Sequence, residues 1–126
     1  RVYYLGNHQI AHNIGLYILS GTGQEYCRML NAGTDWYDAE ESAVFLVDDC
    51  DQLTFLVDDV RDEKKSAKKA VSLKWLPERP NLATKICVEL KYQDVGRCEV
   101  TVTDLGLGEL YPSQKKSVKM LLTEES

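Results

Sequence analysis

The chain has 126 residues, of which 44% are hydrophobic and 28% charged, and its formal net charge is −5. This length predicts a single domain whose core folds without metal or disulfide staples. The acidic balance argues against a nucleic-acid-binding face, and no apolar run approaches the ~20 residues of a membrane-spanning helix. The first residue is Arg1, so we expect a piece of a longer protein, without a signal peptide.

The N-terminal residues 1–13 are expected to be a connecting segment. His8 and His12 are four residues apart, a spacing that would put both on one face of a helix. However, the glycine-asparagine pair at 6–7 favours a turn, and no third ligand lies at the spacing of a known metal site. We therefore predict no metal site in this segment.

The clearest fold signal is a hairpin at 83–104, ATKICVELKYQDVGRCEVTVTD, in which apolar and polar residues alternate on both sides of a turn. Placing both apolar sets on one face pairs Leu90 with Val100. This register leaves a loop at 93–97, where Gly96 can take the positive φ of a short hairpin turn.

A second hairpin is predicted at 42–60, with its turn at 49–52. Both of its strands carry apolar residues on both faces, so we expect something to cover each face. The aspartates around the turn lack the spacing of a calcium loop, and they are explained as turn-forming and solubilising residues.

The remaining predicted strands are short apolar runs bounded by turn residues. They lie at 14–19, 25–31, 70–76 and 118–122. The alternation in the second of these is ambiguous, and the last is a strand or a short helix. Trp36 and Tyr37 are predicted to cap one end of the fold.

Seven or eight short strands without an amphipathic helix predict an all-β fold, an antiparallel two-sheet β-sandwich. We expect the sandwich domain at 14–122, after the connecting segment, and a tail at 123–126. Two of the four cysteines, Cys87 and Cys98, fall on opposite faces of the first hairpin, which disfavours a disulfide between them. Together with Cys27 and Cys50 they lack zinc-site spacing. We therefore expect reduced thiols in a cytoplasmic protein.

Several stretches match, in order, the motifs of one known family. NIGLYI is similar to its SLGIE-type opening strand, AGTDWY stands where it has NTTIP, and VFLVDDCDQLTFLV is similar to its VFSTAEDNQ hairpin. PERPN followed by ICVEL is similar to its PAPRG-x-x-x-IEVTF, and VGRCEVTVTD to its DGxLxVSAxD. Over about residues 13–122 the chain resembles the β-sandwich part of the substrate-binding domain of heat shock protein 70 (DnaK-type) chaperones.

This resemblance implies a sandwich whose loops cradle an extended apolar peptide held by backbone hydrogen bonds. Phe45 falls on the family's pocket-lining phenylalanine, Phe55 on a valine of the pocket floor, and Val57 on the isoleucine that follows it. Asp48 falls on a small residue that arches over the peptide. The implied partners are an extended apolar peptide or a partner protein, and an actin-like ATPase part before Arg1 that would bind ATP. No cofactor is expected in this chain itself.

The chain departs from the family at Phe55, Asp48 and Asn81. The ring of Phe55 predicts a pocket that the protein itself fills, and Asp48 puts a charge beside an apolar peptide. Asn81 stands in place of a glycine and is expected to tolerate left-handed backbone. No helical lid follows in the sequence.

The sequence therefore supports two functional hypotheses. The first is a non-catalytic peptide- or protein-binding module. The alternative is a degenerate sandwich with a filled groove that serves interdomain docking or self-association. An enzyme is not expected, because no serine or cysteine lies in a nucleophile motif.

Overall fold

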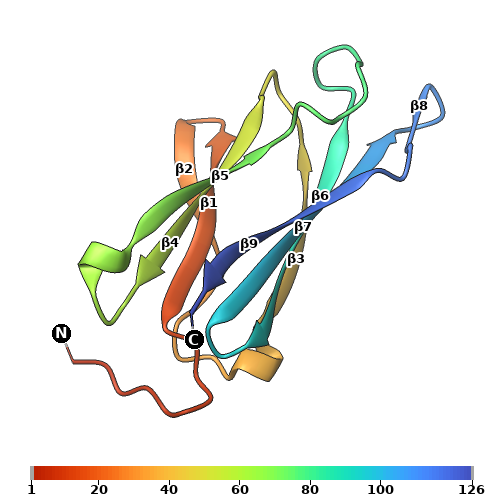
Figure 1. The fold of residues 1–126 in the computed structure, drawn as a ribbon. Coiled ribbons are helices and arrows are strands. Elements are labelled where there is room, and N and C mark those ends of the chain that lie inside the picture. The colour runs from red at the N-terminus through yellow and green to blue at the C-terminus, as the bar shows by residue number, and fades with distance from the viewer. Residues whose placement is uncertain (1, 126) are drawn as a thin grey trace.

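The computed structural model describes residues 2–125 and consists of two antiparallel β-sheets packed face to face (Figure 1). The first sheet has the order β2-β1-β4-β5, with β1 (His12–Ser20), β2 (Gly23–Leu30), β4 (Gln52–Asp59) and β5 (Ala67–Ser72). The second has the order β3-β6-β7-β8, with β3 (Glu40–Leu46), β6 (Lys85–Asp94), β7 (Arg97–Leu107) and β8 (Tyr111–Pro112), while β9 (Ser117–Glu124) also pairs with β7. Two short 3-10 turns complete the described part of the chain, η1 (Trp36–Asp38) and η2 (Glu63–Lys65). The predicted two-sheet β-sandwich is thus confirmed.

The hairpin of β6 and β7 has the predicted register, with Leu90 opposite Val100. Its turn is tighter than expected, because Asp94 still pairs with Arg97. Gly96 does not have a positive φ, so that part of the prediction is wrong. The glycine is needed for a close approach instead, since a Cβ there would lie 2.6 Å from the backbone oxygen of Glu125.

Two strand boundaries differ from the predicted ones. β1 begins at His12, and Ile10 before it is completely buried, so the core includes part of the segment at 1–13. β5 begins at Ala67 and ends at Ser72. The strand predicted at 70–76 is therefore shifted toward the N terminus, into the charged stretch. At the other end of the chain, 118–122 is a strand, within β9.

β2 contains an irregularity that the sequence pattern had left unresolved. Ile14 pairs with Leu30 and Gly15 with Arg28, so Met29 is an extra residue on β2. Such a bulge lets two successive side chains enter the core, and both Met29 and Leu30 are buried. This accounts for the ambiguous alternation at 25–31.

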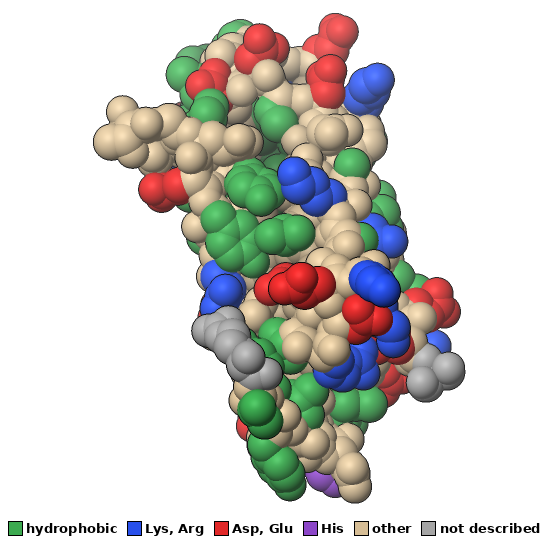
Figure 2. All heavy atoms as spheres, turned by 90° about the vertical axis from the view of Figure 1, so that its left-hand side faces the viewer, with side chains coloured by type: hydrophobic (Ala, Val, Ile, Leu, Met, Phe, Trp, Pro, Cys, Tyr) green, Lys and Arg blue, Asp and Glu red, His purple; other side chains and the backbone are tan. Residues whose placement is uncertain are grey.

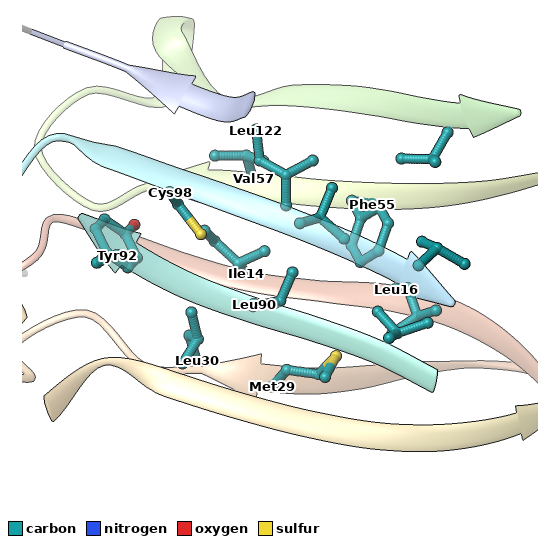
Figure 3. Packing of buried hydrophobic residues seen from close by; sticks show 14 of the residues in the cluster. Ile14, Leu16, Met29, Leu30, Phe55, Val57, Leu90, Tyr92, Cys98 and Leu122 are labelled. Carbon is teal, nitrogen blue, oxygen red and sulfur yellow. The ribbon is translucent and has the colours of Figure 1, made fainter. Parts of the chain in front are cut away.

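The core lies between the two sheets (Figure 3). Leu16 of β1, Phe55 of β4 and Leu90 of β6 all point into it and are at most 1% exposed. In contrast, Val44 and Leu46 of β3 remain 56% and 49% exposed. The expectation that both faces of the 42–60 hairpin are covered is therefore wrong for β3 within residues 2–125.

The outer face of the first sheet carries a smaller group of hydrophobic side chains among charged ones (Figure 2). Tyr17 and Tyr26 pair across β1 and β2 with their rings edge to face, 5.7 Å apart. A Cβ at Gly15 would lie 2.7 Å from the ring of Tyr26, so the ring lies against the glycine backbone. The Nζ atom of Lys68 lies 5.4 Å from the Tyr17 ring centroid, which gives this face an amphipathic cover.

Candidate functional site

An apolar groove of about 410 Å³ lies at one end of the sandwich, between the β1–β2 hairpin and the loop that joins β3 to β4. We call these connecting residues the 47–51 loop. The groove is lined from β1 and β2 by Leu16, Tyr17, Ile18, Leu19 and Gln24, from β3 and the loop by Val44, Phe45, Leu46, Val47, Asp48 and Cys50, and from β4 and β6 by Gln52, Leu53, Thr54 and Ile86. Its volume is within the range of ligand-binding pockets, roughly 300–1,000 Å³.

The rim of this groove is unusually apolar for a surface. Leu19 is 67% exposed, and Val44 and Leu46 are both about half exposed. β3 is the terminal strand of the second sheet as the structure describes it. Its outer edge therefore presents backbone N–H and C=O groups that can pair with another extended chain. An apolar rim beside an open strand edge is a surface that favours an extended, apolar ligand.

The structure brings together two of the four residues that the sequence singled out. Phe45 and Asp48 line the groove, whereas Phe55 and Val57 do not. Phe55 is completely buried and Val57 is 4% exposed, so both belong to the core. Leu53, two residues earlier on the same face of β4, lines the groove in their place.

Sequence reasoning missed the exposed residues of the rim, namely Leu19, Val44 and Leu46. A signal for two of them was present, because β3 is apolar on both faces. We interpreted that pattern as a covered strand, and the exposed alternative would have pointed to a binding edge.

The 47–51 loop is fastened by the side chain of Asn81, in the long connection between β5 and β6. Asn81 Nδ2 donates a hydrogen bond of 2.7 Å to Asp48 Oδ1, and the backbone N–H of Asp49 donates to Asn81 Oδ1. The charge of Asp48 is therefore partnered. Asn81 does not itself have a positive φ; the left-handed residue of this connection is the next one, Leu82, with φ 64°.

The long connection itself, which we call the 73–84 loop, is held by a buried ion pair. Arg79 donates two hydrogen bonds, of 2.7 and 2.8 Å, to the carboxylate of Asp104 on β7. Their side chains are 5% and 0% exposed. The Arg79 hydrogen bonds lower the pKa of Asp104 to about 2, helped by backbone N–H donors of Gln114 and Gly106. This pair fixes the 73–84 loop to the second sheet.

At the opposite end of the sandwich, five residues form a cluster that we call the His12 clasp: His12, Asp59, Arg61, Tyr92 and Glu125. His12 Nε2 lies 3.7 Å from Asp59 and 3.5 Å from Glu125, and His12 Nδ1 lies 3.0 Å from the Tyr92 hydroxyl. A histidine with two carboxylates resembles a cation site. However, the Arg61 guanidinium donates to Asp59 at 2.9 Å and to Glu125 at 2.5 Å and so already supplies the positive charge. The clasp is therefore a structural link between the sheets.

Burial decides the direction of the pKa shift at His12 but not at Asp59. It lowers the pKa of His12, although the carboxylates of Glu125 and Asp59 act in the opposite direction. Burial alone would raise the pKa of Asp59, but hydrogen bonds from Arg61 outweigh it, and the net pKa is lowered. Burial also raises the pKa of the nearby Cys98 thiol to about 12, so this thiol is not a nucleophile at neutral pH.

Among known protein families, a family model described as a domain of unknown function (DUF8552) matches residues 9–123. The chain belongs to this family. None of the curated proteins compared with the chain matches it. The matched region of the DUF8552 domain spans both sheets and includes the groove, the 47–51 loop and the 73–84 loop. Within residues 2–125 of the DUF8552 domain, no helix is long and apolar enough to span a membrane.

Proposed function

We propose that the DUF8552 domain is a non-catalytic module that binds an extended apolar peptide segment in the groove beside β3. The observation that carries the proposal is the coincidence of the groove with exposed Leu19, Val44 and Leu46 and with the open edge of β3. Removing such side chains from water contributes about 25 cal/mol per Å² of apolar area, which offsets the loss of freedom on association.

The form of the ligand follows from the geometry of the groove. The hydrogen-bonding groups on a free strand edge are matched best by another extended chain. One of the two walls, the 47–51 loop, holds Asp48, at which the resemblance to heat shock protein 70 implies a contact with the peptide. A cytoplasmic location is part of the proposal, because Cys50 at the groove has an exposed free thiol, which a reducing compartment would maintain.

A fluorescence-anisotropy titration with labelled heptapeptides tests the proposal. We expect saturable binding of a leucine-centred peptide and none of a serine-substituted one. Leu46→Asp should weaken binding by at least about ten-fold, because it places a charge beside the apolar ligand. Leu110→Asp is the matched control, since Leu110 is 86% exposed and does not line the groove. Equal loss in both variants, or no binding by the wild-type domain, would exclude this function.

The same exposed rim supports a second candidate, docking onto another domain or onto a second copy of the chain. This would also bury Val44 and Leu46. Light scattering over a range of protein concentrations distinguishes the two candidates. A dimer that Leu46→Asp converts to a monomer would favour self-association, whereas a monomer that binds peptide would favour the first candidate.

A further inference from the structure

We propose that Asn81 positions the 47–51 loop over the groove and thereby sets the rates at which an extended peptide enters and leaves. The inference rests on the proposed function of the groove. It assigns a kinetic role to a residue that does not itself line the groove.

The 47–51 loop is a wall shared by two hollows. Val47 and Cys50 line the apolar groove on one side and also a second groove of about 370 Å³ on the other. The second groove is lined on its other side by the 73–84 loop, to which Asn81 belongs. A shift of the 47–51 loop toward Asn81 or away from it therefore changes the width of the peptide groove.

The hydrogen bonds of Asn81 hold this wall in an unfavourable backbone conformation. Asp49, whose N–H donates to Asn81, has φ 44°, and Leu82 next to Asn81 has φ 64°. Left-handed backbone is disfavoured for non-glycine residues, although Asp tolerates it better than Leu does. Without the amide of Asn81, Asp49 gains little by keeping this conformation, and we expect the loop to relax away from the 73–84 loop.

The two sides of this contact differ in rigidity. On one side Asn81 lies only two residues after Arg79, which the buried pair with Asp104 fixes in place. On the other side the contact itself is exposed, because both hydrogen bonds of Asn81 lie at the surface. Exposed hydrogen bonds exchange readily with water and contribute little net free energy. The contact can therefore open while its support stays fixed.

Stopped-flow peptide binding to wild type and three variants, with one control variant, tests the role. The three variants are Asn81→Ala, Asn81→Asp, and the double variant Asn81→Asp with Asp48→Asn. Asn81→Ala removes both hydrogen bonds, and Asn81→Asp brings two carboxylates together. The double variant keeps the total charge and restores both contacts, with the donor and acceptor side chains exchanged. Glu78→Ala is the control, since Glu78 is an exposed residue of the same loop.

We expect both single variants to release the leucine-centred peptide about five-fold faster than wild type, with unchanged melting temperature. The double variant should return the rate to near that of wild type, and Glu78→Ala should not change it. The inference would be overturned if Asn81→Ala released the peptide as slowly as wild type does, or if the double variant did not recover the wild-type rate.

Hydrogen exchange separates a failure of this inference from a failure of the proposed function. The backbone amide of Asp49 should exchange faster in Asn81→Ala than in wild type, with or without peptide. Faster exchange with no peptide binding in any protein would reject the proposed function and, with it, the kinetic role. Peptide binding with unchanged exchange and unchanged rates would reject the role of Asn81 alone.

Discussion

The two ends of the sandwich are built differently. At the end near the chain termini, the His12 clasp joins the sheets through buried polar groups, and the side chains of His12 and Asp59 are at most 4% exposed. At the other end, the sheets separate around the groove, where leucine and valine side chains face solvent. Both ends thus bury polar groups, the Arg79–Asp104 pair at the groove end included, but the groove end also exposes apolar side chains.

This difference suits a clasp end that stabilises the fold and a groove end that makes the proposed contact with a ligand. Buried polar groups are costly unless every one is partnered, and no buried side-chain N or O atom in residues 2–125 lacks a hydrogen-bond partner. The half-exposed Val44 and Leu46 contribute less to folding than fully buried side chains do. The groove end also has a buried support, the Arg79–Asp104 pair, which holds the 73–84 loop.

The largest expected effect comes from breaking that support. Arg79→Met leaves the carboxylate of Asp104 buried without its main partner, so we expect a loss of about 3–5 kcal/mol in the free energy of unfolding measured in urea. The double variant Arg79→Met with Asp104→Asn removes both charges and should recover part of the loss. If Arg79→Met cost under about 1 kcal/mol, the pair would not be the support of the groove end.

An intermediate effect is expected from a substitution of Gly96, beside the His12 clasp. Alanine there would place a Cβ atom 2.6 Å from the backbone oxygen of Glu125, so the chain just after β9 must shift away from the hairpin turn. We expect a loss of about 1–3 kcal/mol in thermal or urea unfolding. Gly21→Ala, in the β1–β2 turn, is the control because no atom lies within 4 Å of its added Cβ. A similar loss in both variants would contradict the packing argument.

The smallest expected effect is the pH response of the clasp. Burial lowers the pKa of folded His12 below the ordinary value of 6.5, so the unfolded chain binds more protons near that pH. The contribution of His12 to stability is therefore present above pH 6.5 and lost as the pH falls through the lower folded pKa.

Urea unfolding of wild type and His12→Gln at a series of pH values measures this contribution. As the pH falls, the unfolding free energy of wild type should decrease more than that of His12→Gln. His8→Gln, which alters an exposed histidine, is the control. A wild type that gains stability over His12→Gln as the pH falls would show that the two carboxylates outweigh burial.

The sequence predicted the strand register best where one face of a strand is buried and the other is exposed to solvent. Alternation then fixes the register, as in the Leu90–Val100 pairing of β6 and β7. The prediction failed where the pattern had two explanations. The two-sided apolar run of β3 fits a covered strand or an exposed binding edge, and only the arrangement of the sheets decides between them.

The candidate site was predicted only in part, for a related reason. Phe45 and Asp48 lie at the groove, but residue-by-residue transfer from the chaperones that the sequence resembles also selected Phe55 and Val57, which are core residues here. The fastening of the loop by Asn81 depends on a contact between residues more than thirty positions apart. Neither periodicity nor turn chemistry reports such a contact, and no local pattern in the sequence signals it.

β1 connects the two ends and has a consequence for how this family can vary in length. Its N-terminal residue, His12, belongs to the clasp, and Leu19, near its other end, lies on the groove rim. Since successive side chains of a strand alternate between faces, one inserted residue within β1 would reverse one end relative to the other. Related sequences are therefore expected to keep this spacing constant and to gain or lose residues in the turns, such as the one at 21–22.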